Sequence, residues 1–328
     1  MHILRDLFIV LFAGTVMLPA QAEANYSQRE DVQQFIEQMV SKHQFDKDKL
    51  TQWFAEATKL DSVLTSISKP AEKTLTWKQY RPIFITSKRI EGGVQFMKDN
   101  RELLQRAQKE YGVPAHLIAA IIGVETYYGK RSGGTGVFDS LTTLGFDYPP
   151  RAKFFRSELE QFLLLAREED ISVKEIQGSY AGAMGMPQFI SSSYRHYAVD
   201  FDGDGKRDLW NNKADVIGSV ANYFKMHGWV KNQPVVYAAS ADKKIKDSGR
   251  DKLKPYTTIA QLRELGVVTD APVDASTEVT LITFDGAQGE EHWLGLKNFY
   301  VITRYNHSAL YAMAVHQLSQ ELLAQAGD

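Results

Sequence analysis

The stretch VPAHLIAAIIGVET, residues 113–126, presents an almost unbroken apolar surface and ends beside a single carboxylate, Glu125. Pro114 suits the first turn of a helix. Large aliphatic side chains recur at helical spacing, at Leu117, Ile118, Ile121 and Ile122. Because a helix that is apolar on most of its faces is normally buried, we expect a mainly α-helical protein built around this segment.

Helical periodicity continues on both sides of it. Apolar residues recur at helical spacing in REDVQQFIEQMVSKH (29–43), and DKDKLTQWFAEA (46–57) repeats the pattern after an Asp that can cap a helix. Pro82 is expected to break any helix in TWKQYRPIFIT, residues 76–86. Further helices are expected over 89–112, 152–170, 213–229 and 307–325.

The pattern changes after Trp229. QPVVYAAS (233–240) and STEVTLITFD (276–285) are rich in β-branched residues and read as strands. We therefore expect an α+β protein in which a small mixed α/β insert, 232–296, interrupts a helical chain. The predicted division is a signal peptide over 1–22, an N-terminal helical domain over 23–110, a core formed by 111–231 with 297–328, and the insert.

The N-terminus has the features of an export signal. LFIVLFAGTVML (7–18) has the length of a signal-peptide core, and small residues follow at Ala20 and Ala22. Cleavage after Ala22 is expected, with Ala24 as the second choice; an uncleaved anchor is the alternative, although the run is short for a membrane span. The chain has no Cys, which fits a bacterial periplasm and excludes lipid attachment at an N-terminal Cys. We expect a soluble periplasmic protein without a membrane anchor.

Several common function classes find no support in the sequence. The net charge of −2 gives no general reason to expect a nucleic-acid partner. The sequence also contains no HExxH, GxSxG, GxxxxGK or GxGxxG motif, which are the signatures of zinc proteases, serine hydrolases and nucleotide-binding proteins.

Glu125 is the first candidate for chemistry. It lies near the C-terminal end of a buried helix, where the macrodipole is negative, and its neighbours are apolar. Both effects disfavour the carboxylate and are expected to raise its pKa. A carboxylic acid that stays protonated near neutral pH can act as a general acid. The alternative is a helix-end Glu that points to water.

The second candidate is GSYAGAMGMPQF, residues 178–189, which combines glycines with the neutral polar groups of Ser179 and Gln188. Glycines allow a backbone to approach a ligand closely, and neutral polar groups beside aromatic rings suit an uncharged polymer such as a glycan. The alternative is a turn packed tightly through its small residues.

These two motifs together resemble the lytic murein transglycosylase B family, glycoside hydrolase family 103, in a soluble, non-lipoprotein form. The resemblance extends in order through YRPIFIT, RIEGGVQF, FDYPPRAKFF, DFDGDGKRDLW, SVANYFKMHGW and NFYVITRYNHSALYAMAVHQL. It covers most of the mature chain and implies a lysozyme-like core.

The resemblance implies that Glu125 alone cleaves the β-1,4 bond from N-acetylmuramic acid (MurNAc) to N-acetylglucosamine (GlcNAc) in peptidoglycan. Glu125 would act first as acid toward the glycosidic oxygen and then as base toward the C6 hydroxyl of the same MurNAc, giving a 1,6-anhydro product. An ordinary glycosidase uses a second carboxylate; here the substrate supplies the attacking group.

The resemblance also carries over substrate-binding positions. These are Ser179, Gln188, Tyr223, Tyr305, Asn306, Tyr311 and Arg151. For each tyrosine the alternative is core packing with a satisfied hydroxyl. Arg151 matches one of two adjacent arginines in the family; because Pro150 stands at the other position, a basic contact to a peptide stem or muramyl carboxylate would be weakened.

A further motif, DFDGDGKRDLWN (200–211), has the start of an EF-hand loop. Asp200, Asp202 and Asp204 stand at loop positions one, three and five, and Gly205 stands at six, where the loop turns sharply. Closely spaced carboxylates repel one another unless a cation lies among them. We expect structural Ca²⁺; a solvated acidic turn is the alternative.

The rest of this loop departs from an EF-hand. Lys206 can offer its backbone carbonyl at position seven, but position twelve is Asn211 instead of the usual Glu. In the family the last ligand comes from the next helix, which makes Asp215 the candidate. Since the loop is longer here than in relatives, the closing ligand stays open.

Two other functions stay open at this point. One is a muramidase that uses water and a distant second carboxylate, such as Asp139 or Asp147; the other is a catalytically silent peptidoglycan-binding protein. Peptidoglycan glycan strands are the expected partner in each case, with cell-wall synthesis or division proteins as further partners and a monomer as the expected state. The sequence does not distinguish cleavage at chain ends from internal cleavage, or say whether peptide stems are required.

Overall fold

The computed structural model describes residues 25–68, 74–241 and 252–326, so the predicted signal peptide lies outside the described residues. Contacts divide the chain into two compact units, Met1–Ala57 and Thr58–Asp328. Among the helices of the described ranges, none has both the length and the apolar character needed to cross a membrane.

The first unit is a short helical segment. It contains the helices α1 (Glu30–His43) and α2 (Lys47–Ala55), as the periodicity predicted, preceded by the 3₁₀-helix η1 (Tyr26–Gln28). The Asp46 carboxylate caps α2 by accepting a hydrogen bond from the Lys49 amide at 2.8 Å. Phe35 and Phe54 meet edge to face, which fixes α1 against α2.

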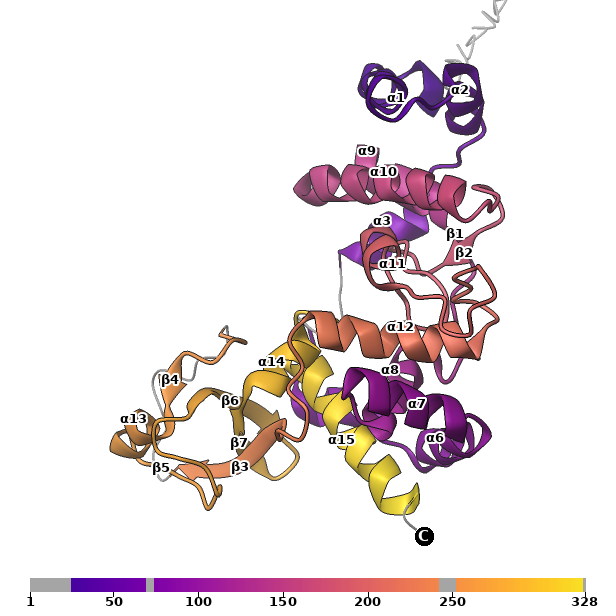
Figure 1. Cartoon of the computed structure of the whole chain (residues 1–328). Coiled ribbons are helices and arrows are strands. Elements are labelled where there is room, and N and C mark those ends of the chain that lie inside the picture. The colour runs from indigo at the N-terminus through magenta and orange to yellow at the C-terminus, as the bar shows by residue number, and fades with distance from the viewer. Residues whose placement is uncertain (1–24, 69–73, 242–251, 327–328) are drawn as a thin grey trace, which may run out of the picture. The chain divides into compact units, whose positions relative to one another are not determined.

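The second unit is built around α8 (Ala115–Thr126), as expected for the most apolar segment. Every residue from Leu117 to Val124 is buried. The helices that contact α8 come both from the sequence directly before it and from distant parts of the chain (Figure 1). They are α6 (Ser87–Asp99), α7 (Arg101–Tyr111), α12 (Lys213–Met226) and α15 (Ala309–Ala326).

These contacts explain why the compact units differ from the predicted domains. We expected an N-terminal domain over 23–110, but α6 and α7 pack on α8, α12 and α15 and belong with them. The contacts therefore divide the chain after Ala57, and a domain boundary near residue 110 has no counterpart in this division.

Two local expectations were wrong. The stretch 89–112 is two helices, because Asn100 leaves helical geometry and its buried side-chain amide donates to the Phe96 carbonyl at 2.7 Å. Pro82 does not break α5 (Trp77–Phe84). A proline removes the bond to the carbonyl four residues earlier; here that carbonyl belongs to Lys78, an exposed residue where water can replace the bond.

A second group of helices lies beside this core. It contains α3 (Asp61–Ile67), α9 (Val137–Asp147), α10 (Ala152–Glu168) and α11 (Ser191–Tyr197), with the 3₁₀-helix η2 (Pro149–Arg151). The two-residue strands β1 (Thr135–Gly136) and β2 (Gln177–Gly178) pair antiparallel. The sequence analysis did not identify α9, which is buried along nearly all its length and so lacks a polar face.

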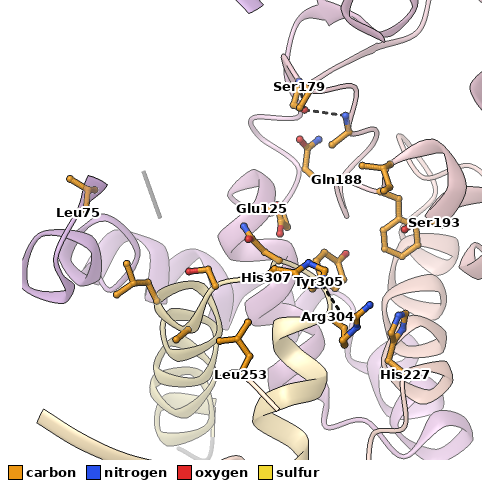
Figure 2. A pocket seen from close by; sticks show the side chains of 18 of the residues that line it. Leu75, Glu125, Ser179, Gln188, Ser193, His227, Leu253, Arg304, Tyr305 and His307 are labelled. Carbon is orange, nitrogen blue, oxygen red and sulfur yellow. Dashed lines mark hydrogen bonds between the residues drawn. The ribbon is translucent and has the colours of Figure 1, made fainter. Parts of the chain in front are cut away.

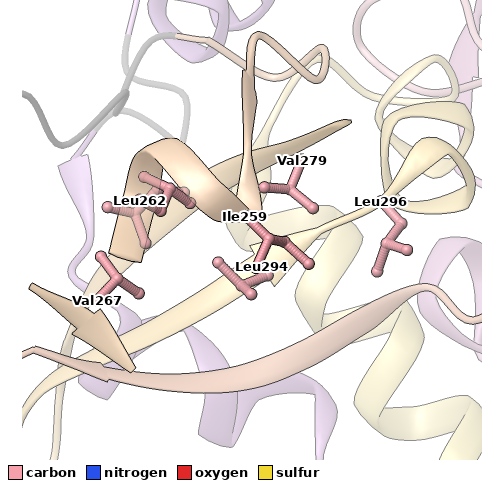
Figure 3. Packing of buried hydrophobic residues seen from close by; sticks show 7 residues of the cluster. Ile259, Leu262, Val267, Val279, Leu294 and Leu296 are labelled. Carbon is pink, nitrogen blue, oxygen red and sulfur yellow. The ribbon is translucent and has the colours of Figure 1, made fainter. Parts of the chain in front are cut away.

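The strands predicted after Trp229 form a five-stranded antiparallel sheet, in the order β4-β6-β7-β3-β5. The strands are β3 (Val236–Ala241), β4 (Thr257–Thr258), β5 (Val267–Val268), β6 (Glu278–Gly286) and β7 (Gly289–Gly295). Helix α13 (Ile259–Glu264) contributes Ile259 and Leu262 to a small core of its own against this sheet (Figure 3). All of these elements lie within the range predicted for the insert, and the chain then continues through α14 (Lys297–Thr303) into α15.

Candidate active site

A cavity of approximately 1620 Å³ opens in the second unit and collects most of the predicted site residues. Its lining includes Glu125, Arg151, Ser179, Gln188, Tyr223, Tyr305 and Asn306. Figure 2 shows Glu125 between Gln188 and Ser179 on one side and Tyr305 and His307 on the other. Segments far apart in the sequence thus converge on one carboxyl group.

Glu125 is the penultimate residue of α8 and is half-buried. The Tyr311 hydroxyl, on α15, donates a hydrogen bond to Glu125 Oε1 at 2.5 Å. Burial and the charge of Glu125 raise the pKa of Tyr311 well above its usual value, so this phenol stays protonated. Tyr311 does not line the cavity itself; it lies behind Glu125 and holds it.

The backbone after Glu125 turns sharply. Tyr127 and Tyr128 both adopt left-handed conformations, with φ of 54° and 61°. The Tyr128 hydroxyl donates to the Arg89 carbonyl at 3.0 Å, and its ring lies where methyl groups on Gly93 or Gly123 would overlap it. The glycines of α6 and α8 therefore admit the tyrosine that fixes the end of α8.

Ser179 and Gln188 present neutral polar groups from the loop before α11. Ser179 Oγ accepts from the Ala183 amide at 3.0 Å, which leaves its O–H as a donor for a ligand. The Gln188 amide nitrogen donates to the carbonyls of Ser132 and Gly185 at 3.1 and 2.9 Å. Its oxygen is thereby oriented as an acceptor for a ligand.

The tyrosine hydroxyls bind within the protein. Tyr223 donates to the Arg304 carbonyl at 2.6 Å, and Tyr305 donates to the Pro187 carbonyl at 2.7 Å. The rings of Tyr305 and Tyr311 are stacked, with centroids 6.4 Å apart. A ligand in the cavity would therefore meet the rings of Tyr223 and Tyr305 as a wall, because their hydroxyls already have acceptors.

The lining residues that the sequence analysis missed include His227, Arg304 and His307. Arg304 and His307 flank the predicted Tyr305 and Asn306, and this adjacency was the only available signal. Arg151 is exposed, with its guanidinium 4.3 Å from the ring centroid of Phe154.

The structure does not bring a predicted second carboxylate to Glu125. Neither Asp139 nor Asp147 lines the cavity. Asp139 instead accepts a hydrogen bond from the Thr58 amide at 3.1 Å. Within the described ranges, the other carboxylates on the cavity wall are Asp285 and Glu290, which belong to the β6–β7 hairpin of the insert.

The acidic loop forms a separate cluster. Carboxylate oxygens of Asp200, Asp202 and Asp204 lie within 4.8 Å of one another. Gly205 has a φ of 89°, as the sharp turn requires, and its amide donates to Asp200 at 2.8 Å. This bond is the main reason that the pKa of Asp200 is lowered. Three carboxylates around one point suit a hard cation such as Ca²⁺.

Asp215, the candidate for the closing ligand, does not join this cluster. It is fully buried, and its two oxygens accept hydrogen bonds from the amides of Phe201 and Asp208 at 2.7 and 2.8 Å. Asp215 therefore links the backbone near the start of the loop, at Phe201, to the backbone at Asp208. Lys206 is exposed, and its amide donates to Asp204 at 2.9 Å.

The chain is similar in sequence to known proteins over most of its length. The model of the family described as "Transglycosylase SLT domain" matches residues 27–320. Membrane-bound lytic murein transglycosylase B of Escherichia coli K12 is 44% identical over 309 residues, covering 92% of this chain and 84% of its own.

Solved structures are also similar. Lytic transglycosylase SltB1 of Pseudomonas aeruginosa gives a TM-score of 0.87 at 49% identity, covering 92% of this chain and 100% of its own. E. coli Slt35 in complex with calcium gives 0.84 at 42%, covering 93% and 96%. SltB3 of P. aeruginosa in complex with NAG-anhNAM-pentapeptide gives 0.74 at 28%, covering 90% and 79%.

Proposed function

Because the chain belongs to the transglycosylase SLT domain family, with the lysozyme-like fold of the lytic transglycosylases, we propose that it cleaves peptidoglycan between MurNAc and GlcNAc and leaves 1,6-anhydro-MurNAc ends. The observation that carries this proposal is the position of Glu125. It is the one carboxylate that the helical part of the described chain contributes to the cavity wall.

The proposed reaction needs one carboxyl group in two protonation states. Glu125 donates its proton to the glycosidic oxygen as the bond from C1 to that oxygen breaks, and GlcNAc leaves as an alcohol. The Glu125 carboxylate then removes the proton of the MurNAc C6 hydroxyl, whose oxygen bonds to C1. Protons balance and no water is consumed, so a second carboxylate is unnecessary.

Tyr311 supports this double role. Since its hydroxyl donates to Oε1, the transferred proton belongs on Oε2. The same hydrogen bond stabilises the carboxylate after the first step and orients it for the second. Ser179 and Gln188 would fix the sugar through neutral hydrogen bonds, while Tyr223 and Tyr305 form an aromatic wall beside it.

The test is the mass of the products. Purified peptidoglycan is digested with the protein and, in parallel, with Glu125→Gln, and the muropeptides are weighed. We expect products lighter by one water than hydrolytic muropeptides, and none from the variant. Products of full hydrolytic mass would identify a muramidase, whereas unchanged activity in Glu125→Gln would contradict the assignment of the acid.

We also propose that Asp200, Asp202 and Asp204 bind Ca²⁺ in a structural role. Their mutual distances and the calcium complex of E. coli Slt35 support this. The ion would neutralise the loop that precedes α12, and the chemistry at Glu125 would not use it. Closure of the loop would rest on the hydrogen bonds of Asp215.

The export features of the sequence support a periplasmic location, with cleavage after Ala22. N-terminal sequencing of the protein recovered from a periplasmic extract tests this, and an intact N-terminus in the membrane fraction would contradict it. Peptidoglycan strands are the proposed partner; proteins of cell-wall synthesis or division are further candidates that co-purification would test.

A further inference from the structure

One buried hydroxyl joins three segments of the site. Thr126 directly follows the acid and is only 1% exposed. Its Oγ1 donates a hydrogen bond to the Met186 carbonyl at 2.8 Å, the nearer acceptor, since the Ile122 carbonyl lies at 3.3 Å. Oγ1 also accepts a hydrogen bond from the Gly129 amide at 3.0 Å. Thr126 does not line the cavity, so it acts on the site through its neighbours.

Met186 belongs to the loop that carries Gln188, and this loop is closely anchored. The Met186 amide donates to the Leu209 carbonyl at 2.8 Å, and the Met186 sulfur lies 3.0 Å from the position that a Cβ on Gly129 would occupy. Gln188 itself has a left-handed φ of 52°. A residue with a Cβ keeps such a conformation only where its surroundings enforce it. The direction of the Gln188 amide therefore depends on the anchors at Met186.

The hydrogen bond from Thr126 to Met186 thus connects two groups that must act on the same sugar. Glu125 comes from α8 and Gln188 comes from a loop far along the chain, and both line one cavity (Figure 2). We propose that Thr126 is a positioning residue, which holds the acid in register with the amide that binds the sugar and thereby determines which nucleophile reaches C1. This inference rests on the proposed function and deepens it.

Two nucleophiles can attack C1 once the glycosidic bond breaks, and both need the same base. When the C6 hydroxyl attacks, its oxygen bonds to C1, its proton goes to the Glu125 carboxylate, and the product is a 1,6-anhydro end. When water attacks, its oxygen bonds to C1, one of its protons goes to Glu125, and the product is a reducing end, heavier by one water. Geometry selects between them, because a shift of about 1 Å in a positioned reactant can cost roughly a hundredfold in rate. A looser register between Glu125 and Gln188 should therefore increase the share of reducing ends.

The test compares Thr126→Val, which keeps the shape of the side chain and removes the hydroxyl, with Thr126→Ser, which keeps the hydroxyl. Purified peptidoglycan is first treated with borohydride, so that every reducing end found after digestion is new. Mass spectrometry then gives the ratio of reducing to anhydro ends, and initial rates are measured beside it. We expect Thr126→Val to lower the rate about tenfold and to raise the share of reducing ends severalfold. Thr126→Ser should keep the ratio of the parent protein.

A matched control separates register from stability. Thr143→Val removes a buried hydroxyl of α9, which accepts a hydrogen bond from the Leu60 amide at 3.1 Å and does not line the cavity. This variant should lower the melting temperature and leave the ratio of ends unchanged, because the ratio is a property of each folded molecule and not of their number. If Thr126→Val does not unfold cooperatively, Thr126→Ala takes its place and should shift the ratio in the same direction.

The ratio of ends gives the decisive outcomes. An unchanged ratio in the folded variant without the Thr126 hydroxyl would overturn the positioning role, even if the rate fell, and so would an equal shift in Thr143→Val. A shift in Thr126→Ser as large as in Thr126→Val would also overturn it, since the hydroxyl would then not be the cause. Reducing ends as the main product of the parent protein, or no products at all, would instead contradict the proposed function.

Discussion

The chain uses acidic residues in two opposite ways. Glu125 stands by itself on the helical wall of a cavity, half-buried, with the Tyr311 hydroxyl on one oxygen. Asp200, Asp202 and Asp204 stand together in a loop, where backbone amides meet the Asp200 oxygens. Both regions present carboxylates at the ends of helices or beside them, yet their surroundings suit different tasks.

The difference lies in what each carboxylate can do with a proton. An isolated acid among aromatic rings can exchange a proton with a ligand, because no other acid competes for it. In the acidic loop, hydrogen bonds from the backbone amides, first of all that of Gly205, lower the pKa of Asp200 and so favour its charged form. The first arrangement favours catalysis and the second favours a cation.

The largest expected effect is on catalysis at Glu125. Glu125→Gln should lower the rate of murein cleavage by at least about a thousandfold, since the residue serves as both acid and base. Thermal unfolding in the presence of calcium should stay close to that of the parent protein. If Glu125→Gln lowered the melting temperature but left the rate of murein cleavage unchanged, Glu125 would have a structural role and the catalytic assignment would be wrong.

The next largest expected effect is a fall in the free energy of unfolding as the pH decreases. Burial, with the nearby His116, lowers the pKa of His316 on α15 from 6.5 to about 4. The unfolded chain therefore binds this proton more readily, so stability is full above pH 6.5 and falls as the pH decreases toward 4. The expected loss is on the order of 3 kcal/mol.

Urea unfolding between pH 7 and 4 measures this loss. His316→Gln should flatten the curve. Asp200 should keep its charge through this window, because its pKa is lowered from 3.8. An unchanged slope in His316→Gln would place the acid sensitivity elsewhere.

Removal of calcium should lower the stability of the protein through the loop that contains Asp200, Asp202 and Asp204, without acting on the site around Glu125. With free calcium at a hundred times its dissociation constant, binding should stabilise the protein by about 2.7 kcal/mol. Asp202→Ala should abolish the increase in melting temperature that calcium gives to metal-stripped protein. Asp270→Ala, at an exposed acid of the insert, is the matched control; no calcium effect on the parent protein would refute the site.

The smallest expected effect concerns the hydrogen bond that distinguishes Glu125 from the loop carboxylates. Tyr311→Phe should lower the cleavage rate about ten- to a hundredfold, the range for a bond to a charged group. Initial rates on peptidoglycan measure it, and Tyr237→Phe, at a residue packed against the core of the insert, should have no effect. Equal rates for both variants would show that Tyr311 does not position the acid.

Local patterns predicted much of this fold. The apolar stretch before Glu125 identified the central helix, and β-branched runs identified β3 and β6. Helix α9 escaped detection because nearly every residue in it is buried, which leaves no amphipathic period to read. Pro82 misled because a proline near the end of a short helix loses one bond at an exposed carbonyl.

The site was predicted in part, for a related reason. Sequence motifs marked Glu125, Ser179 and Gln188, which the fold brings to one cavity. The direction of a side chain depends on tertiary contacts that spacing does not specify. Tyr311 therefore lies behind the acid, and Asp215 binds two amides below the loop.

The turn after Glu125 depends on neighbouring segments, so the acid cannot be moved to another protein by itself. Left-handed conformations at Tyr127 and Tyr128 each cost about 1–2 kcal/mol for residues with a Cβ. They persist because the Tyr128 ring is packed over Gly123 and Gly93 and anchored to Arg89. A designer who grafts the acid alone onto another scaffold would lose this support. The smallest portable module therefore spans α6, α8 and the tyrosine pair, and it is inherited or engineered as a unit.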